Sequence, residues 1–302
     1  MPSCTKPARP PEEDVRLIVL DLDGTLLDSS GTVPPGNMHA LCEAARRGIH
    51  LAFCSGRFPD DISYFASRFP SEISKSISIL ALNGSCALES PYGPLLWTQH
   101  IAGDDVRRSV SILREAKCVY ALFCDHDLFV HEIERGVFTD DFYWGSHMTD
   151  PPSRTCIWRD RGEDMLISRG VSKIVALDVQ DPDRLHDVQR RIESMLPHLE
   201  YSSSWRGNFE INPPSIHKGY AVESLARRLQ LPLSTVMAVG DQTNDLPMLR
   251  SAGIPVAMGN APEMVRKVCR YLTLDHDACG VQAAVEALAL HIAQPYGTLL
   301  PL

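Results

Sequence analysis

The sequence predicts an α/β fold in which a domain built on a parallel sheet is interrupted by an inserted α+β domain. Two patterns predict it: strands alternate with helices at both ends of the chain, and antiparallel hairpin signals fill the middle. The length of 302 residues, 44% of them hydrophobic, suffices for two domains of ordinary size. We therefore expect the two ends of the chain to build one domain together.

The first part of the chain alternates strand and helix. Apolar runs predict strands at residues 15–20, 49–54 and 77–82, and amphipathic patterns predict helices at 35–47 and 59–69. Because each helix is long enough to cross back over the sheet, these strands are expected to be parallel.

The same alternation resumes after about residue 214. The predicted helices and strands are, in order, helix 218–229, strand 235–239, helix 245–251, strand 254–257, helix 262–269 and helix 280–291. Residues 15–84 and 214–302 are therefore expected to form the core domain, whereas the polar, proline-rich residues 1–14 are expected to be a flexible extension.

Residues 85–213 have a different pattern and are expected to form the inserted α+β domain. Two pairs of short strands flank turn sequences, and a strand, a helix and two further strands follow. The predicted elements are strands 86–89, 95–98, 119–124, 128–131 and 171–178, helix 183–195, and strands 200–203 and 208–212.

Composition excludes some classes of protein. A net charge of −9 without a basic tract argues against extended nucleic-acid binding but not against a small anionic ligand. No apolar run approaches the roughly 18 residues of a membrane span, and the first residues do not resemble a secretory signal. The nine cysteines are scattered without a CxxC pair, which favours free thiols and a cytoplasmic location.

The most informative stretch is Asp21-Leu22-Asp23-Gly24-Thr25, which follows the first predicted strand directly. Two carboxylates this close repel each other unless a cation or a shared proton intervenes. One of them could attack an electrophile while the other moves protons. An ordinary Asp-Gly turn after a strand is the alternative.

Three further polar segments occupy predicted strand ends or helix starts, where open α/β sheets bind their ligands. Ser55-Gly56-Arg57 offers hydroxyl and amide donors for phosphate, or a simple helix cap. Lys218 is the first residue of a predicted helix, where its positive charge opposes the helix dipole. A bound phosphate would explain this placement, and a solvated surface lysine is the alternative.

The third segment runs from Gly240 to Asp245. Its two acids and Asn244 suit a hard cation and the hydrogen bonds around it. A side-chain cap for the next helix would explain one of these polar residues, but not all of them.

These segments, in this order, resemble the four motifs of the haloacid dehalogenase superfamily: DLDGT, CSGR, HKG and GDQTND. More narrowly, the chain is similar to the Cof-type phosphatases, whose large α/β cap is inserted between the second and third motifs. Stretches around Asn83, Glu210 and Asn260 match that branch too. The resemblance spans residues 15 to 290 and implies a Rossmann-like core.

The resemblance implies a role for each acid. Asp21 would be the nucleophile that becomes an aspartyl phosphate, and Asp23 would be the general acid and base. Mg²⁺ would be held by Asp21, by the backbone carbonyl of Asp23 and by Asp241.

The groups that the resemblance assigns to the phosphate are Ser55, the amide of Gly56, Lys218 and Asn244. Asn244 could instead contact a metal-bound water. Asp245 is either an outer-shell acid for magnesium or a partner of Lys218, and Arg57 either faces the phosphate or pairs with a nearby acid, the second being favoured.

The expected function is Mg²⁺-dependent hydrolysis of small phosphate monoesters, such as sugar phosphates. A sugar phosphomutase of the same superfamily and a catalytically silent ligand-binding protein are the alternatives. The expected partner is a small phosphorylated metabolite, with no nucleic acid and no membrane, and the chain is expected to be a monomer or a weak homodimer. Cap hinges are expected near residues 83–86 and 212–215.

Overall fold

The structure is a computed structural model that describes residues 14–124, 127–131, 154–158, 162–178, 181–203, 207–293 and 298–302. The predicted N-terminal extension therefore lies outside the described residues, apart from Asp14. The described chain falls into two compact units. The first contains Met1–Cys54, Phe65–Ser78 and Val222–Leu302, and the second contains Ser55–Tyr64 and Ile79–Ala221.

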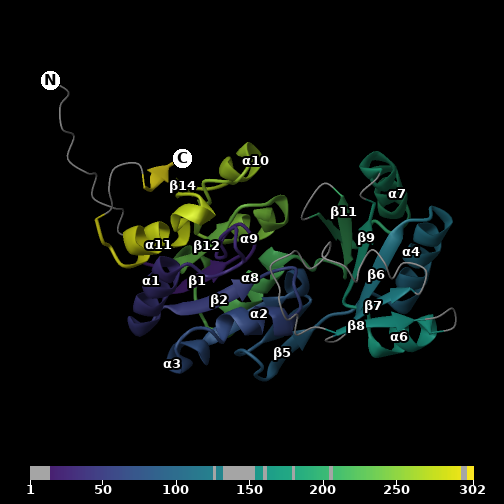
Figure 1. Ribbon diagram of the computed structural model, residues 1–302, viewed down its shortest axis with the longest axis horizontal. Coiled ribbons are helices and arrows are strands. Elements are labelled where there is room, and N and C mark those ends of the chain that lie inside the picture. Colours follow the sequence, from purple (N-terminus) through teal and green to yellow (C-terminus); the bar gives the residue numbers. More distant parts are fainter. Residues whose placement is uncertain are drawn as a thin grey trace. The chain divides into compact units, whose positions relative to one another are not determined.

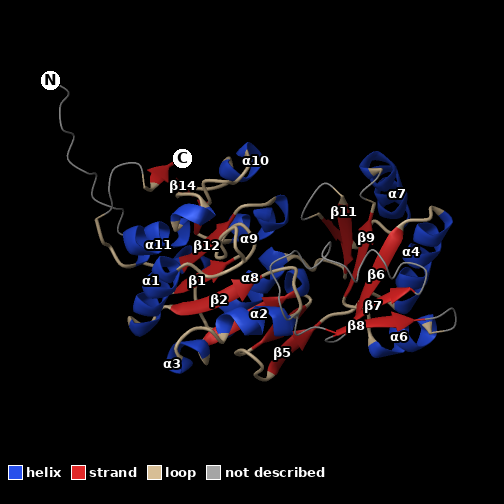
Figure 2. Cartoon of the chain, viewed as in Figure 1, coloured by secondary structure: helices blue, strands red, loops and turns tan. Residues whose placement is uncertain are grey.

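A parallel sheet forms the centre of the first unit (Figures 1 and 2). Its strand order is β15-β14-β13-β12-β1-β2, and only the β14–β15 pair is antiparallel. The strands are β1 (Leu17–Leu20), β2 (His50–Cys54), β12 (Val236–Gly240), β13 (Ile254–Ala257), β14 (Tyr271–Leu272) and β15 (Leu300–Pro301). Strands β1 and β12 are buried along their whole length, which explains their continuous apolar sequences.

Short helices connect these strands. They are α1 (Pro35–Arg46), α3 (Ser71–Ser74), η3 (Leu233–Thr235), η4 (Thr243–Asp245), α9 (Leu246–Ser251), α10 (Glu263–Arg266), η5 (His276–Ala278), α11 (Gly280–Ala284) and the π-helical turn η6 (Val285–Ala289). Three elements run from one unit into the other: α2 (Pro59–Ala66), β3 (Ile77–Ala81) and α8 (Lys218–Arg228).

Three predicted helices end differently. Helix 59–69 stops at Ala66, and helix 262–269 keeps only the turn Glu263–Arg266. Helix 280–291 changes to a π-helical turn at Val285, so it is α-helical for five residues only. Helix ends fray where side chains no longer pack, and apolar spacing alone does not mark these positions.

The second unit contains a mostly antiparallel sheet of order β10-β11-β9-β6-β7-β8, in which only β7 and β8 are parallel. Its strands are β6 (Val119–Cys124), β7 (Asp127–His131), β8 (Arg154–Trp158), β9 (Lys173–Leu177), β10 (Glu200–Ser202) and β11 (Asn208–Asn212). The short strands β4 (Cys86–Leu88) and β5 (Leu95–Thr98), with η1 (Leu82–Gly84), follow β3.

Helices cover one face of this sheet (Figure 1): α4 (Gly103–Glu115), α6 (Glu163–Arg169) and α7 (Pro182–Met195). Alternate strand residues pack against them in one apolar core, among them Tyr120, Leu122, Ile174 and Phe209. The residues between these, including Phe123, Lys173 and Glu210, must therefore face away from that core. This second face carries the polar cluster described below.

The predicted fold class, a parallel-sheet α/β core with an inserted α+β segment, is confirmed. Helices α4 and α6 and strand β8 are absent from the predicted elements. None of the helices in the described part of the chain is long and apolar enough to cross a membrane.

Candidate active site

Three acidic side chains meet in the first unit. Strands β1 and β12 run parallel with Leu20 opposite Val239, so the residues that follow them, Asp21 and Asp241, leave the sheet at the same edge. Carboxylate oxygens of Asp21, Asp241 and Asp245 lie within 4.8 Å of one another. These side chains are only 6%, 2% and 0% exposed, respectively. The sheet thus concentrates negative charge at one buried point.

The side chain of Asp245 holds the loop after β12 through hydrogen bonds to its backbone. Its Oδ2 accepts hydrogen bonds from the backbone amides of Asp241 and Gln242, both at 2.9 Å. A Cβ atom at Gly240 would lie 2.8 Å from the Asp245 side chain, so glycine permits this close approach. One consequence is that the backbone of Asp241 is fixed by the same acid that lies beside its side chain.

Both carboxylate oxygens of Asp241 accept hydrogen bonds. Thr25 Oγ1 donates to Oδ1 at 3.0 Å, and Asn260 Nδ2 donates to Oδ2 at 3.1 Å and to the carbonyl of Gly24 at 2.9 Å. Gly24 has a φ of +74°, and a Cβ atom there would lie 2.5 Å from Asp241 Oδ2. Thr25 and Asn260 lie in motif-like stretches, yet the sequence alone assigns neither of them a role.

The donor set fits Mg²⁺. Buried carboxylates at this distance repel one another, and a hard divalent cation with oxygen ligands compensates that repulsion. Asn244 adds a second observation, because its Oδ1 is a buried acceptor without a hydrogen-bond partner in the described structure. A water on a hydrated cation would supply the missing donor. Asp23, by contrast, is exposed within its unit.

The second unit holds the loop Ser55-Gly56-Arg57, which follows β2. Ser55 is buried, and its Oγ accepts a hydrogen bond from the amide of Arg57 at 3.2 Å. That contact leaves the Ser55 hydroxyl proton available to a ligand. Among the described residues, the amide of Gly56 has no acceptor. The loop thus has one hydroxyl donor and one amide donor available to a ligand.

Lys218 belongs to the same unit and is the first residue of α8. Its side chain is 1% exposed, so it is not the solvated surface lysine of the alternative interpretation. The preceding residue, His217, accepts a hydrogen bond from the amide of Tyr220 through Nδ1 at 3.0 Å and thereby caps the helix start. Gly84 touches this turn, where an added Cβ atom would lie 2.9 Å from the carbonyl of His217.

A buried polar cluster that the sequence alone did not identify surrounds Lys173 of β9. Lys173 Nζ donates to the carbonyl of Gly56 at 2.7 Å and to Glu210 Oε1 at 3.2 Å, and it lies 4.4 Å from the centre of the Phe123 ring. Asn83 Nδ2 donates to Glu210 Oε2 at 2.6 Å. A lysine directly before the apolar run from residue 174 to 177 is the signal that could have revealed this cluster.

The ionisation of this cluster is set by burial and by the pair itself. Burial raises the pKa of the Glu210 carboxyl, but the Lys173 charge and the hydrogen bonds from its neighbours outweigh burial, so the pKa is lowered overall. Burial lowers the pKa of the Lys173 ammonium, and the Glu210 charge offsets only part of this change. Each member therefore needs the other to remain charged inside the protein.

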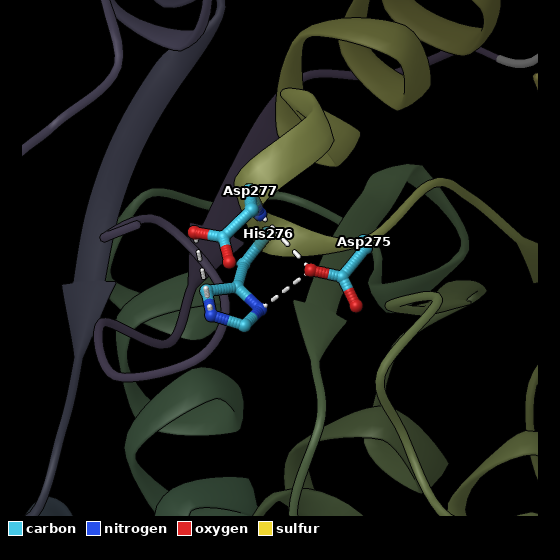
Figure 3. Close-up of side chains that lie close together, drawn as sticks. All are labelled: Asp275, His276 and Asp277. Carbon is cyan, nitrogen blue, oxygen red and sulfur yellow. Dashed lines mark hydrogen bonds and ion pairs between the residues drawn. The ribbon is translucent and has the colours of Figure 1, made fainter. Parts of the chain in front are cut away.

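A second acidic group in the first unit comprises Asp275, His276 and Asp277 (Figure 3). His276 Nδ1 lies 2.9 Å from Asp275 Oδ1, and Asp277 accepts hydrogen bonds from the amide and the hydroxyl of Ser29 at 2.7 and 2.6 Å. The side chains of Asp275 and Asp277 are about half exposed. Through these contacts, the group connects η5 to the segment that follows β1, which gives it a structural role.

The comparisons with known proteins agree with this geometry. A family model for haloacid dehalogenase-like hydrolases matches residues 18–285. The phosphatase YwpJ of Bacillus subtilis is 28% identical over 287 residues, which cover 88% of this chain and 97% of that protein. The 5-amino-6-(5-phospho-D-ribitylamino)uracil phosphatase YcsE of the same organism is 26% identical over 272 residues, which cover 90% and 95%.

A solved structure of a haloacid dehalogenase-like hydrolase from B. subtilis superposes with a TM-score of 0.78 at 27% identity. The match covers 90% of this chain and 99% of that one, so it includes the inserted segment as well as the parallel sheet. The resemblance to Cof-type phosphatases that the four motifs predict is confirmed. The chain belongs to the haloacid dehalogenase-like hydrolase family.

Proposed function

We propose that the protein is a Mg²⁺-dependent phosphatase that hydrolyses small phosphate monoesters through an aspartyl phosphate. The observation that supports this proposal most is the group of buried carboxylates at the ends of β1 and β12. A fold that only needed a turn after β1 would not gather three acids there. The phosphatases YwpJ and YcsE, which cover most of this chain, support the same reaction class.

In the proposed reaction, a carboxylate oxygen of Asp21 attacks phosphorus as the ester bond to the leaving oxygen breaks. Asp23 gives its proton to the leaving alkoxide and then takes a proton from water as that water attacks the aspartyl phosphate. The second displacement releases inorganic phosphate and restores both carboxyl groups. Asp23 can reach solvent within its own unit, which suits a group that exchanges protons with water.

The phosphate oxygens are proposed to bind to Ser55, the amide of Gly56 and Lys218. The free hydroxyl proton of Ser55 and the unpartnered amide of Gly56 support this assignment, because donors fixed before binding cost little to reorganise. Lys218 adds a buried positive charge in the same unit. Asn244 is proposed to contact the phosphate or a metal-bound water, in line with its unpartnered Oδ1.

Mg²⁺ is proposed to be held by Asp21, the carbonyl of Asp23 and Asp241, with Asp245 behind them. When bound, the cation offsets the repulsion between an anionic nucleophile and an anionic phosphate. Asp245 and Asn260 hold Asp241 in place for this task, from its backbone and from its side chain respectively.

We propose a small phosphorylated metabolite as the substrate, because the name of YcsE specifies such a compound for that relative. Residues 85–213 are proposed to form the cap that selects it. A cytoplasmic location and a monomeric or weakly dimeric state stay predictions. None of the cysteines whose pairing the structure describes forms a disulfide, which supports a reducing compartment.

Turnover of p-nitrophenyl phosphate tests the proposal. The wild-type protein should release p-nitrophenol with Mg²⁺, lose this activity in EDTA and regain it when Mg²⁺ is restored. Asp21→Asn should abolish turnover because the amide cannot attack phosphorus, while folding stays intact. Asp187→Asn, at an exposed position on α7, is the matched control and should keep full activity. Full activity of Asp21→Asn, or activity in EDTA, would refute the assignment.

A further inference from the structure

The loop Ser55-Gly56-Arg57 is held by a donor on each of its three carbonyls. The carbonyl of Ser55 accepts from the amide of Asn83 at 3.1 Å, that of Gly56 from Lys173 Nζ at 2.7 Å, and that of Arg57 from the amide of Leu82 at 3.0 Å. Two of these donors are backbone amides of the neighbouring segment. The third is a charged side chain that lies 117 positions further along the chain.

The placement of Lys173 is costly for the fold. Its side chain is fully buried on the face of the sheet that turns away from the apolar core, and a buried ammonium needs a partner for its charge. Glu210 supplies that charge from β11, and Phe123, directly opposite Lys173 in the β6–β9 register, contributes its ring face. The third contact of the ammonium goes to the carbonyl of Gly56.

The contact between Lys173 and the carbonyl of Gly56 also affects the amide at the other side of the same peptide group. The carbonyl of Gly56 and the amide of Arg57 belong to the same trans peptide, so they point in opposite directions. The ammonium holds the carbonyl, and the amide on the other side donates to Ser55 Oγ. A positive charge on the carbonyl also polarises the peptide and strengthens the amide as a donor.

We infer that Lys173 is a positioning residue for the phosphate-binding loop, which orients the hydroxyl of Ser55 through the Gly56–Arg57 peptide. With its Oγ engaged by the amide of Arg57, the Ser55 hydroxyl is directed to donate its proton to a phosphate oxygen. This inference rests on the proposed phosphatase function. It extends that function to a residue of the inserted segment that need not touch the substrate.

Direct binding of inorganic phosphate in the presence of Mg²⁺ tests the inference. Titration calorimetry on the Asp21→Asn protein separates binding from turnover. Because Lys173→Met alone would leave Glu210 buried without the charge that keeps it ionised, the informative variant is Lys173→Met with Glu210→Gln, compared with Glu210→Gln alone. The single change keeps the contact from Lys173 to Gly56, whereas the double change removes it.

Loss of a hydrogen bond from a charged donor should weaken phosphate binding about tenfold in the double variant, and Glu210→Gln alone should stay within about threefold. Ser55→Ala should also weaken binding. Adding Ser55→Ala to the double variant should cause little further loss, because both changes remove the same oriented hydroxyl. Arg184→Met, which breaks an ion pair with Asp178 at the other end of β9, is the control and should bind normally.

Equal losses in Glu210→Gln and in the double variant would overturn the inference, since the ion pair alone would then explain them. So would additive losses from Ser55→Ala and the double variant, normal binding in the double variant, or no phosphate binding by the parent. Circular dichroism and urea unfolding check that each variant is folded. Turnover of p-nitrophenyl phosphate by the chain that retains Asp21 is measured separately, so failure of the proposed hydrolysis is distinguishable from failure of this inference.

Discussion

Asp241 has its two carboxylate oxygens fixed by two different side chains, Thr25 and Asn260. Such supporting hydrogen bonds orient a metal ligand before the metal arrives. We expect Asn260→Ala to weaken binding of divalent cations by about 10- to 100-fold, as is usual when a supporting contact is lost. Mn²⁺ binding followed by electron paramagnetic resonance measures this directly, and Mg²⁺ titrations of activity should shift equally.

Two conservative variants sharpen this test. Asn260→Asp also removes the donor, but it adds a carboxylate whose repulsion with Asp241 a cation offsets, so it should weaken metal binding less than Asn260→Ala. Thr25→Ser keeps a hydroxyl and should bind the cation nearly as well as the wild type. Unchanged Mn²⁺ binding in Asn260→Ala would mean that Thr25 and the loop amides suffice to hold Asp241.

At the level of single residues, sequence could identify groups whose chemistry is explicit in a short motif. Asp21 and Asp241 are such groups, because an acid directly after a buried strand has few structural uses. Lys173 is different. Its role depends on Gly56 and Glu210, which lie far from it in the chain and meet it only through the register of the sheet. No short motif contains that information.

Strand β2 carries a half-buried histidine whose protonation should affect folding. His50 Nε2 lies 2.9 Å from Ser78 Oγ of β3, and burial lowers the pKa of His50 below its ordinary value of 6.5. In acid, the unfolded chain therefore takes up this proton before the folded chain does. The stability from neutral His50 is present above about pH 6.5 and is lost as the pH falls through the lowered folded pKa.

His50→Gln should remove this pH dependence, since glutamine can still bond to Ser78 but does not titrate. We expect the free energy of unfolding in urea to fall more steeply for the wild type than for His50→Gln between pH 7.5 and pH 5. The difference between the two proteins is the relevant quantity, because all other titrating groups cancel in it. Parallel curves would show that His50 ionises equally in the folded and unfolded chains.

At the level of elements, helices and strands were predicted correctly where the apolar pattern in the sequence was continuous. The buried strands β12 and β13 appear where short apolar runs predict them. Helix α4 was missed although Val106, Val110 and Leu113 have helical spacing and are buried. Polar residues separate these three apolar residues in the sequence, so the apolar side of α4 is not obvious there. Its role becomes clear only when the sheet against which α4 packs is known.

For the whole molecule, the sequence predicts two domains from the change in pattern near residues 85 and 213, and those boundaries stay a prediction. The two compact units of the structure divide the chain elsewhere, assigning Ser55–Tyr64 and the start of α8 to the second unit. Contacts such as that between Lys173 and Gly56 join segments that the pattern separates. Sequence patterns register local structure, whereas compact units follow from contacts between distant segments.

The division into units leads to a prediction about how Mg²⁺ stabilises the protein. The acidic cluster lies in the first unit, whereas Trp97 lies in the second. A ligand that binds only the folded state adds about 2.7 kcal/mol at 100 times its Kd. If the units unfold separately, this gain belongs to the first unit.

Far-UV circular dichroism reports on both units during urea unfolding. In a chain whose other three tryptophans are replaced by phenylalanine, the fluorescence of Trp97 reports on the second unit. Relative to EDTA, Mg²⁺ should move part of the dichroism transition to higher urea and leave the fluorescence midpoint nearly unchanged. Asp241→Asn should abolish the shift because it removes a carboxylate from the cluster. Equal shifts of both signals would show that the two units unfold as one, since the stabilisation would then spread over the whole chain, and no shift in either would argue against a cation at Asp21 and Asp241.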